Sequence, residues 1–226
     1  MNNTLAILIA TRHRKDLLMQ CLAQLKWLVA YRPVMIYLVF DGDWEGYKCF
    51  DYKVFNQGFA GQVFHIEHGE YIEAINTMAE LAYAAGCEYF LPWSDDSFLK
   101  GERPLRKVIR ALRTAAGPGN KSPVVMALNN PYWGDRLGTH AMMNRAMVDF
   151  LDYGRGKIFF PGYTHYGGDN ELTARAKRGG YFHFIEEVEI EHPPPTETQN
   201  NPSMKYKAHD VPLWKERKRA IDAGEV

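Results

Sequence analysis

The stretch YFLPWSDDSFLKG, residues 89–101, changes from apolar to acidic within a few positions. Its first five residues form an apolar run, which is typical of a strand buried in a sheet. Asp95 and Asp96 follow closely, so we expect them at the end of that strand. Adjacent carboxylates stay ionised only beside a cation, and Mg²⁺ or Mn²⁺ bound to phosphate oxygens suits them. For an Asp-Asp pair alone, the alternative is a solvated turn after the strand.

Apolar runs of the same kind occur earlier in the chain. Residues 5–10 and 34–40 are continuous apolar segments, and we expect both to be strands buried on two faces of a sheet. Between them, residues 15–30 carry apolar side chains at three- and four-residue spacing, which predicts a helix. A second helix is predicted over 71–85, before the strand at 89–93. This alternation predicts right-handed crossovers and a parallel α/β core.

The rest of the chain continues the α/β pattern. Further strands are predicted at 62–66, 124–128 and 181–190, and further helices at 104–116, 141–151, 169–178 and 212–223. We therefore expect a single α/β domain over residues 1–226, with a mostly parallel central sheet flanked by helices. Residues 196–226 should form a C-terminal loop and helix extension. The polar segment 196–207 is expected to be a mobile lid over a bound ligand, with a plain surface loop as the alternative.

The composition is that of an ordinary globular protein. Of 226 residues, 46% are hydrophobic and 24% charged, and 27 Lys and Arg balance 27 Asp and Glu. This balance disfavours nonspecific binding to a polyanion such as nucleic acid. Cys21, Cys49 and Cys87 show no metal-ligand spacing, which indicates reduced thiols. Since no apolar run approaches the ~20 residues of a membrane span, we expect a soluble, cytoplasmic protein.

Polar groups follow the first two predicted strands. Thr11, Arg12 and Arg14 precede a helix N-terminus, where anions are favoured, and arginine can bind phosphate through two hydrogen bonds. Asp41 ends the second strand and could accept hydrogen bonds from a nucleoside. The alternatives are a solvated loop and an aspartate in a turn. The chain has no GxGxxG or Walker sequence, which argues against Rossmann dehydrogenases and P-loop enzymes.

Two further candidates lie in the last third of the chain. Asp169 starts a predicted helix within GGDNEL, residues 167–172. Favourable interaction with the helix dipole explains an acid there, and the functional alternative is a general base. His192 follows the last predicted strand, directly before three prolines. It is either a structural histidine or a ligand that completes an oxygen-rich metal site.

In order and spacing, these segments resemble the family-2-like glycosyltransferases of the GT-A fold. The resemblance extends from residue 5 to about His192 and has four parts. They are the first strand with TRHR at 11–14, VFDGD at 39–43, the helix with Asn76 and the strand leading to Asp96, and GDNELTAR at 168–175 with GGY at 179–181. In that family the corresponding segments bind the nucleotide, form the DxD-type metal motif and supply the catalytic base.

The resemblance implies a metal-dependent transfer of a sugar from a nucleotide-diphosphate donor to a hydroxyl acceptor, with inversion. Mn²⁺ or Mg²⁺ would be held by Asp96 and His192, and Asp169 would be the catalytic base. The donor would be bound by Thr11, Arg12, Arg14, Asp41, Asn76 and Asp95. Aromatic faces stack on sugars and bases, so the acceptor side would include Trp133, His140, Tyr163 and His165.

Two positions depart from the family pattern. Ser94 replaces the first acid of the DxD motif, and Gly168 replaces the Glu of the usual Glu-Asp pair, which leaves Asp169 as the acid at the base position. The missing DxD acid keeps open a catalytically inactive module that binds nucleotide-sugars. A nucleotidyltransferase would use the same sheet and metal but attack phosphorus, and its usual first loop with glycine and lysine is absent.

Basic residues are concentrated near two predicted helices. The first group is Arg103, Arg106, Lys107, Arg110 and Arg113, and the second is Lys215, Arg217, Lys218 and Arg219. The favoured interpretation is a solvated helix face. A nucleic-acid base as acceptor is the alternative, and the sequence does not identify the acceptor otherwise.

Overall fold

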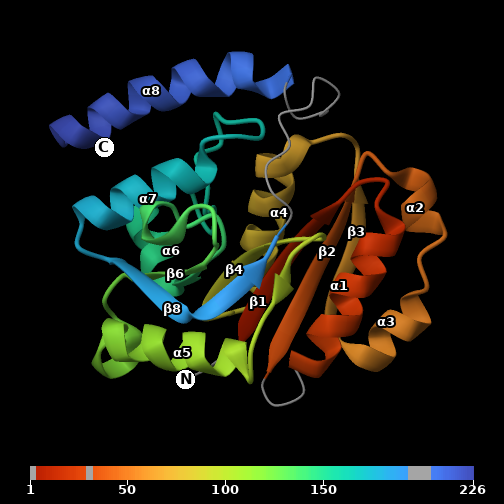
Figure 1. The fold of residues 1–226 in the computed structure, drawn as a ribbon. Helices are drawn as coiled ribbons and strands as arrows, with labels where there is room; N and C mark the ends of the chain where they lie inside the picture. The colour runs from red at the N-terminus through yellow and green to blue at the C-terminus, as the bar shows by residue number, and fades with distance from the viewer. Residues whose placement is uncertain (1–3, 29–32, 193–204) are drawn as a thin grey trace.

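Four parallel strands form the first half of a central sheet in the computed structural model, which describes residues 4–28, 33–192 and 205–226. Their spatial order is β3-β2-β1-β4 (Figure 1). Because all four are parallel, their carboxyl ends meet at one edge of the sheet. Their bounds are β1 (Leu5–Thr11), β2 (Val34–Asp41), β3 (Ala60–Ile66) and β4 (Tyr89–Ser94).

The second half of the sheet is mixed. β7 (Ala141–Asn144) pairs antiparallel with both β4 and β6 (Val125–Asn129). β8 (Phe182–Glu191) runs parallel to β6, and the short β5 (Phe98–Leu99) pairs antiparallel with β8. The described residues thus form an eight-stranded sheet in the order β3-β2-β1-β4-β7-β6-β8-β5. The expected α/β fold with a mostly parallel central sheet is confirmed.

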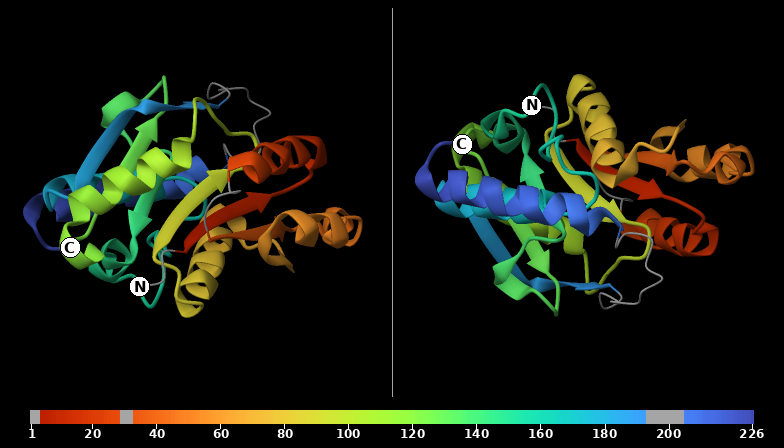
Figure 2. Two further views of the ribbon diagram at one scale, coloured as in Figure 1. Left: turned by 90° about the horizontal axis from the view of Figure 1, so that it is seen from below. Right: turned by 90° about the horizontal axis from the view of Figure 1, so that it is seen from above.

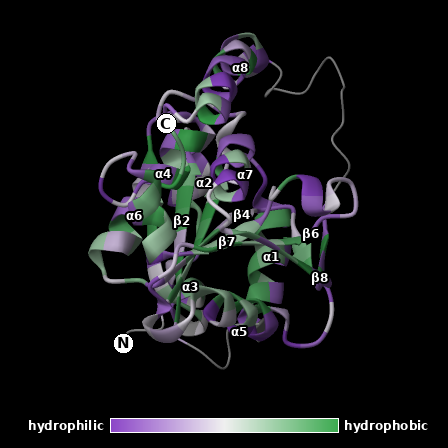
Figure 3. Cartoon of the chain, turned by 90° about the vertical axis from the view of Figure 1, so that its left-hand side faces the viewer, coloured by the Kyte–Doolittle hydropathy of each residue, from purple (hydrophilic) through white to green (hydrophobic). Residues whose placement is uncertain are grey.

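Both faces of the central strands are buried, which explains their continuous apolar sequences. Leu5 and Ile7 of β1 pack into one core, and the alternating Ala6 and Leu8 pack into another on the opposite face. Figure 2 shows helices on both sides of the sheet, and Figure 3 shows the hydrophobic strands between them. The first face is covered by α1 (Lys15–Leu28) and α5 (Pro104–Ala116), and the second by α4 (Glu70–Ala84), α6 (Arg145–Leu151) and α7 (Gly168–Arg178).

The predicted helix over 141–151 is wrong in its first four residues, which form β7. Met142 packs into one core and Met143 into the other, so the segment alternates like a strand. Asn144 then begins α6, because its side-chain oxygen accepts a hydrogen bond from Met147 N at 3.1 Å. A short apolar run fits the helical and the extended period equally well, and this explains the error.

Other short helices lie between the predicted strands and longer helices. They are α2 (Trp44–Lys48), α3 (Tyr52–Gly58), and the 3₁₀ helices η1 (Pro118–Asn120) and η2 (Gly134–Arg136). The last helix, α8 (Lys207–Ala223), starts before the predicted residue 212 and contains Pro212. Of the proposed lid, 196–204 lie outside the described residues. In the part of the chain that is described, no helix is long and apolar enough to cross a membrane.

α8 is attached to α7 by a buried ion pair. The Glu171 carboxylate, 1% exposed, accepts hydrogen bonds at 2.6 Å from both Nε and Nη2 of Arg217. Tyr153 and Tyr163 donate their hydroxyls to the same carboxylate, at 2.5 and 2.8 Å. The Arg217 guanidinium also lies 3.5 Å from the ring centroid of Phe160. A buried pair with so many hydrogen bonds holds one relative orientation of the two helices.

Glu171→Gln should destabilise the protein, because it leaves the Arg217 guanidinium without its counter-charge in a largely buried position. We expect a loss of about 3 kcal/mol in the free energy of unfolding, measured by urea denaturation. Lys218→Ala is the matched control, since it breaks the exposed pair with Asp222 and should cost less than ~1 kcal/mol. Equal losses in the two variants would contradict this assignment.

Candidate functional site

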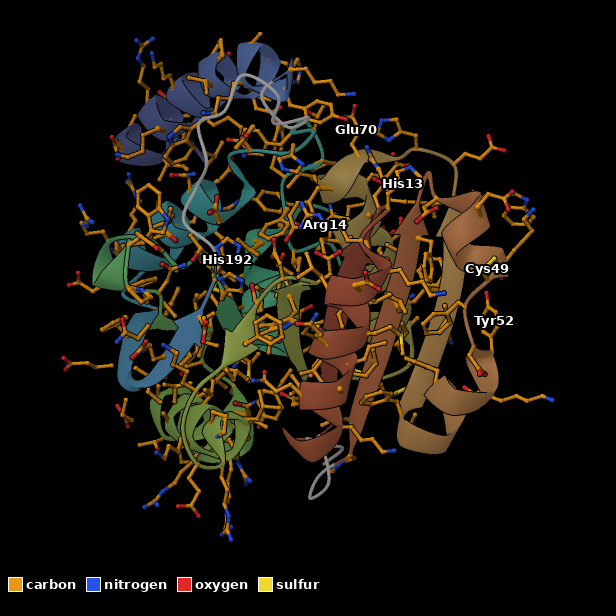
Figure 4. All side chains as sticks on the ribbon, turned by 45° about the vertical axis from the view of Figure 1, so that its right-hand side comes forward. His13, Arg14, Cys49, Tyr52, Glu70 and His192 are labelled. Atoms are coloured by element: carbon orange, nitrogen blue, oxygen red, sulfur yellow. The ribbon has the colours of Figure 1, made fainter. Side chains whose placement is uncertain are left out.

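The carboxyl edge of the parallel strands collects the polar residues singled out in the sequence. Thr11, Asp41 and Ser94 are the last residues of β1, β2 and β4. These strands are direct neighbours in parallel register, so their last residues lie side by side. Figure 4 shows Arg14 and His192 near this edge, from opposite halves of the chain.

Arg14 joins the two adjacent acids. Its Nη1 donates to Asp95 Oδ1 at 3.0 Å and to Asp96 Oδ2 at 2.8 Å. The Thr11 hydroxyl donates to the other oxygen of Asp95 at 2.7 Å. The turn after β1 is thereby bonded to the acids that follow β4, as the sequence predicted for the two strand ends.

The two acids have different electrostatic surroundings. Burial raises the pKa of Asp95, while Arg14 and the Thr11 hydroxyl oppose the rise. Burial acts on Asp96 too, but hydrogen bonds from His192 and Ser94 hold the pKa of Asp96 well below its usual range. Asp96 is therefore the more firmly ionised carboxylate of the pair and the better ligand for a cation.

Asp96 and His192 fit a divalent metal as a partial ligand set. Nε2 of His192 lies 3.4 Å from Asp96 Oδ1, and the Ser94 hydroxyl donates to the same oxygen. One carboxylate with one imidazole suits Mn²⁺ or Mg²⁺ if other oxygens complete the coordination. Within the described residues, no group of three or more His, Cys, Asp or Glu side chains could hold a metal. The remaining ligands would therefore be phosphate oxygens and water.

The ring of His140 packs against the ring of His192. The two rings are 5.3 Å apart at their centroids, and Nε2 of His140 is 2.8 Å from the Ser97 hydroxyl. His140 also packs against Trp93, with centroids 5.1 Å apart. Burial lowers the pKa of His140 to about 3, so its ring is neutral. These contacts make His140 a support for His192, although it was predicted as an acceptor-side group.

Arg12 is paired with Asp41. Its guanidinium forms an ion pair with the Asp41 carboxylate, and its Nε donates to the Asp41 carbonyl at 2.9 Å. The other carboxylate oxygen of Asp41 accepts from Gly69 N at 2.9 Å, and the guanidinium also lies 2.9 Å from His68 Nδ1. Asp41 is thus held by charge and backbone at the end of β2, with Arg12 as its partner.

His13 turns the chain between the two arginines. Its φ of 53° is left-handed, which is uncommon for a residue with a side chain. Asp43 stabilises this conformation, since it accepts from His13 N at 2.9 Å and lies 3.1 Å from the His13 ring nitrogen. The sequence analysis did not single out either contact. A cavity of about 210 Å³ adjoins the turn, lined by Thr11, His13, Lys15, Leu18, Met19, Phe40, Asp43, Gly46 and Phe50.

Asp169 lies in the first turn of α7, as predicted. Its Oδ1 accepts hydrogen bonds from Asn170 N at 2.8 Å and from the Asn170 side chain at 3.0 Å. Burial nevertheless raises the pKa of Asp169. Burial also raises the pKa of Tyr71, and the charges of Asp169, Asp96 and Asp95 add to the rise. Tyr71 of α4 is therefore close to the candidate base and to the acid pair.

Aromatic rings from three segments meet beside Arg12 and Arg14. His165 lies between Tyr71 and Tyr206, with ring centroids 5.4 and 5.5 Å away, and is stacked on Tyr206. The Tyr206 hydroxyl is 3.4 Å from His68 Nε2. Burial lowers the pKa of His165 to about 4, with the charges of Arg12 and Arg14 contributing. The described end of the proposed lid, at Tyr206, thus lies at this site.

Three other predicted residues lie in different surroundings. The side-chain amide of Asn76 forms hydrogen bonds to the backbone with both of its polar atoms. Its nitrogen donates to the Phe159 carbonyl at 2.9 Å, and its oxygen accepts from the N–H groups of Ile158 and Phe159. Tyr163 is buried against Glu171. Trp133 is 38% exposed, beside η2. A donor could reach Asn76 only by displacing these bonds, whereas Trp133 is accessible.

His68 and Tyr71 were not predicted as site residues, whereas Tyr206 belongs to the segment 196–207 that was expected to form a lid. Each belongs to a loop or a helix end without a recognisable motif. Their positions become significant only through contacts with Arg12 and His165, which are distant in sequence. The one available signal was that His68 and Tyr71 directly follow a predicted strand, on the side where ligands bind in such sheets.

Asp210 of α8 holds the loop before α7. Its fully buried carboxylate accepts from the backbone N–H groups of Thr164, His165 and Tyr166 at 3.0, 2.8 and 2.7 Å. Burial opposes ionisation, but hydrogen bonds from His209 and these N–H groups lower the pKa of Asp210 to about 2. α8 thereby fixes the loop that carries His165 into the site.

Comparison with solved structures gives fold matches that span nearly the whole chain. One is mannosyltransferase PcManGT from Pyrobaculum calidifontis in complex with GDP-Man and Mn²⁺, with a TM-score of 0.64, 16% identity, and coverage of 96% of this chain and 64% of that chain. Another is TarS 1-349 from S. aureus in complex with UDP-GlcNAc, with a TM-score of 0.62, 11% identity, and coverage of 86% and 60%. No family model and no curated protein matches the sequence.

These structures confirm the GT-A-like fold that the sequence resemblance implied. The chain spans about 64% of the length of PcManGT and 60% of the TarS fragment. At these identities the likeness concerns the fold.

Asp210→Asn should make the stability of the folded protein depend less on pH in the acid range. Because the folded pKa of Asp210 lies below its unfolded value, its contribution is present at neutral pH and is lost as the pH falls from about 4 to about 2. The variant should therefore melt at a lower temperature than the wild type at neutral pH, and the difference should shrink at pH 2. Circular dichroism melting curves across this range measure it. A constant difference at all pH values would exclude the assigned role of this carboxylate.

Proposed function

We propose that the chain is a metal-dependent glycosyltransferase that moves a sugar from a nucleotide-diphosphate donor to a hydroxyl acceptor with inversion. One observation carries the proposal: Asp96 and His192 meet at the carboxyl edge of the parallel sheet, beside the Arg14 that joins Asp95 and Asp96. Nucleotide-sugar ligands in PcManGT and TarS support the choice of donor class.

Asp96 and His192 would hold the metal. Mn²⁺ in PcManGT supports the use of a divalent cation, and Mg²⁺ is the alternative ion. When bound, the cation would offset the negative charge that develops on the leaving diphosphate. Ser94, which replaces the first DxD acid, would orient the proposed ligand, since its hydroxyl donates to Asp96 Oδ1.

The donor would lie along the edge from Asp95 to Asp41. Arg14, half exposed beside both acids, is the side chain suited to the phosphates. Thr11 and Asp41 would bind the nucleoside, and Arg12 would orient Asp41 through their ion pair. Asn76 remains a predicted donor-binding residue, although its hydrogen bonds favour a structural role for it.

Asp169 would accept the proton of the acceptor hydroxyl. Burial raises its pKa, which makes the carboxylate a stronger proton acceptor than an exposed aspartate. Burial, with the charges of nearby carboxylates added, raises the pKa of Tyr71, so its hydroxyl stays protonated and can donate a hydrogen bond. Attack from the face opposite the leaving group gives inversion.

The acceptor is proposed only as a hydroxyl compound. Trp133 and His165 are the predicted acceptor-side residues whose positions support this role, since one is exposed and the other lies beside the site. Tyr163 and His140 are engaged in buried contacts with Glu171 and Ser97. A nucleic-acid base as acceptor stays possible but is not favoured.

Two alternatives use the same residues. An inactive nucleotide-sugar-binding module would bind donor and metal without turnover, and a nucleotidyltransferase would attack phosphorus. A donor screen by mass spectrometry, with and without Mn²⁺, separates them. Release of a nucleoside diphosphate supports the transferase, pyrophosphate supports the nucleotidyltransferase, and metal-dependent binding without turnover supports the module.

Asp96→Ala should abolish metal-dependent donor binding while leaving the fold intact. The reason is that the variant loses the ionised ligand and leaves His192 alone. Calorimetric titration of UDP or GDP in the presence of Mn²⁺ measures this. Asp135→Ala, which changes an exposed aspartate within η2, is the control and should bind like the wild type. Equal affinities in the Asp96 and Asp135 variants would exclude Asp96 as a ligand.

Asp169→Asn should lower turnover by ~100-fold or more and leave donor affinity nearly unchanged. The amide keeps the size and hydrogen bonding of the carboxylate but cannot accept the proton. Turnover is measured with the donor found in the screen, and NMR of the product reports its anomeric configuration. Near-normal turnover would mean that Asp169 serves only to stabilise the start of α7. A product with retained anomeric configuration would rule out an inverting base.

A further inference from the structure

The outer face of α5 is unusually basic. Its inner face is buried in the core, and its solvent side carries Arg106, Lys107, Arg110 and Arg113. Among the residues that the structure describes, none of these four cations forms an ion pair with a carboxylate. Arg106, Arg110 and Arg113 are spaced four and three residues apart, so they share one face over about 10 Å of helix.

These three arginines line one cavity. Its volume is about 770 Å³, within the range of ligand sites in proteins. The segment Gly117–Asn120, which follows the helix, also lines it. The complete lining is Glu88, Tyr89, Arg106, Arg110, Arg113, Thr114, Gly117, Pro118, Gly119 and Asn120.

The cavity is remote from the candidate active site. Glu88 and Tyr89 lie at the amino end of β4, whereas Asp95 and Asp96 follow its carboxyl end. Six strand residues at about 3.3 Å each put roughly 20 Å between the two places. Figure 1 shows α5 at the opposite end of the sheet from α8, and the two views of Figure 2 show each helix in front.

The charges in the cavity favour an anion. The lining contains three arginines and a single acidic residue, Glu88, whose carboxylate accepts a hydrogen bond from the Asn120 side chain. Guanidinium groups bind phosphate with paired, charge-assisted hydrogen bonds. A concave site with several arginines suits a discrete phosphorylated ligand better than the flat contact of a long polyanion.

We propose that the cavity between α5 and residues 117–120 is a binding site for a phosphate-bearing ligand, held by Arg106, Arg110 and Arg113. The ligand is a small soluble phosphate compound or the phosphorylated headgroup of a lipid. The proposal does not depend on the function assigned to the other end of the sheet, since it uses none of the same residues.

The test is an NMR titration of the whole protein with pyrophosphate in the absence of metal. Backbone amides of Gly117, Gly119 and Asn120 report on the cavity, while Gly42 and Gly167 report on the other edge. We expect saturable shifts at the first three amides. Arg106→Gln/Arg110→Gln/Arg113→Gln should weaken this binding at least about 10-fold.

Lys215→Gln/Lys218→Gln/Arg219→Gln is the matched control, because it removes the same charge from the exposed side of α8 and should keep the shifts. If the triple α5 variant does not fold, Arg110→Gln alone should still weaken binding. Absence of shifts at Gly117 and Gly119, or equal weakening in the α8 control, would overturn the proposal.

Vesicles separate the two sources of phosphate. A lipid headgroup is identified if the protein co-sediments with phosphatidylcholine vesicles that contain phosphatidic acid but not with vesicles of phosphatidylcholine alone. The triple α5 variant should then no longer co-sediment. Pyrophosphate binding without vesicle binding would identify a soluble ligand. A single-stranded oligonucleotide tests for a general polyanion surface. If it binds more tightly than pyrophosphate and the α8 control variant also weakens its binding, the proposal of a discrete site is wrong.

Discussion

The contact of one guanidinium with two adjacent carboxylates is the interaction on which the candidate site depends. Unit charges about 4 Å apart near a protein surface repel by roughly 4 kcal/mol, a large part of the net stability of a domain. Arg14 offsets this repulsion between Asp95 and Asp96, and it also bonds the turn after β1 to the end of β4. The turn after β1 is thus fixed on two sides, by Arg14 on the acids that follow β4 and by His13, which bonds Asp43 after β2.

The parts that could be predicted from the sequence share a physical cause. β1, β2 and β4 are buried on both faces, so their sequences are continuously apolar and their ends are abrupt. Parallel pairing then brings the polar residues after each strand to one edge, which is how Arg14 could be expected near Asp95 without any structure. β7 lacked such a signal, because a run of only three apolar residues fits a helix as well as a strand.

The remaining site residues could not be predicted, because local sequence does not encode a distant partner. Tyr163 and His140 were predicted on the acceptor side because they are aromatic. In the structure, Tyr163 donates a hydrogen bond to Glu171, and the ring of His140 packs against the ring of His192. Tyr206 belongs to the predicted lid segment, and Asp210 and Arg217 fix the helix that follows it, α8, against the rest of the fold. A pattern indicates which residue types are available, and packing decides which of them meet.

The Glu171–Arg217 pair also has a consequence for how the sequence can change by descent. Neither partner tolerates loss of the other, since each would be left charged in a largely buried position. The two positions are therefore expected to change together during evolution. Joint replacement of both residues by apolar residues is the change that the fold can accept. For the same reason, shortened versions of the chain that end before residue 217 would expose a defect inside α7 rather than merely remove a terminal helix.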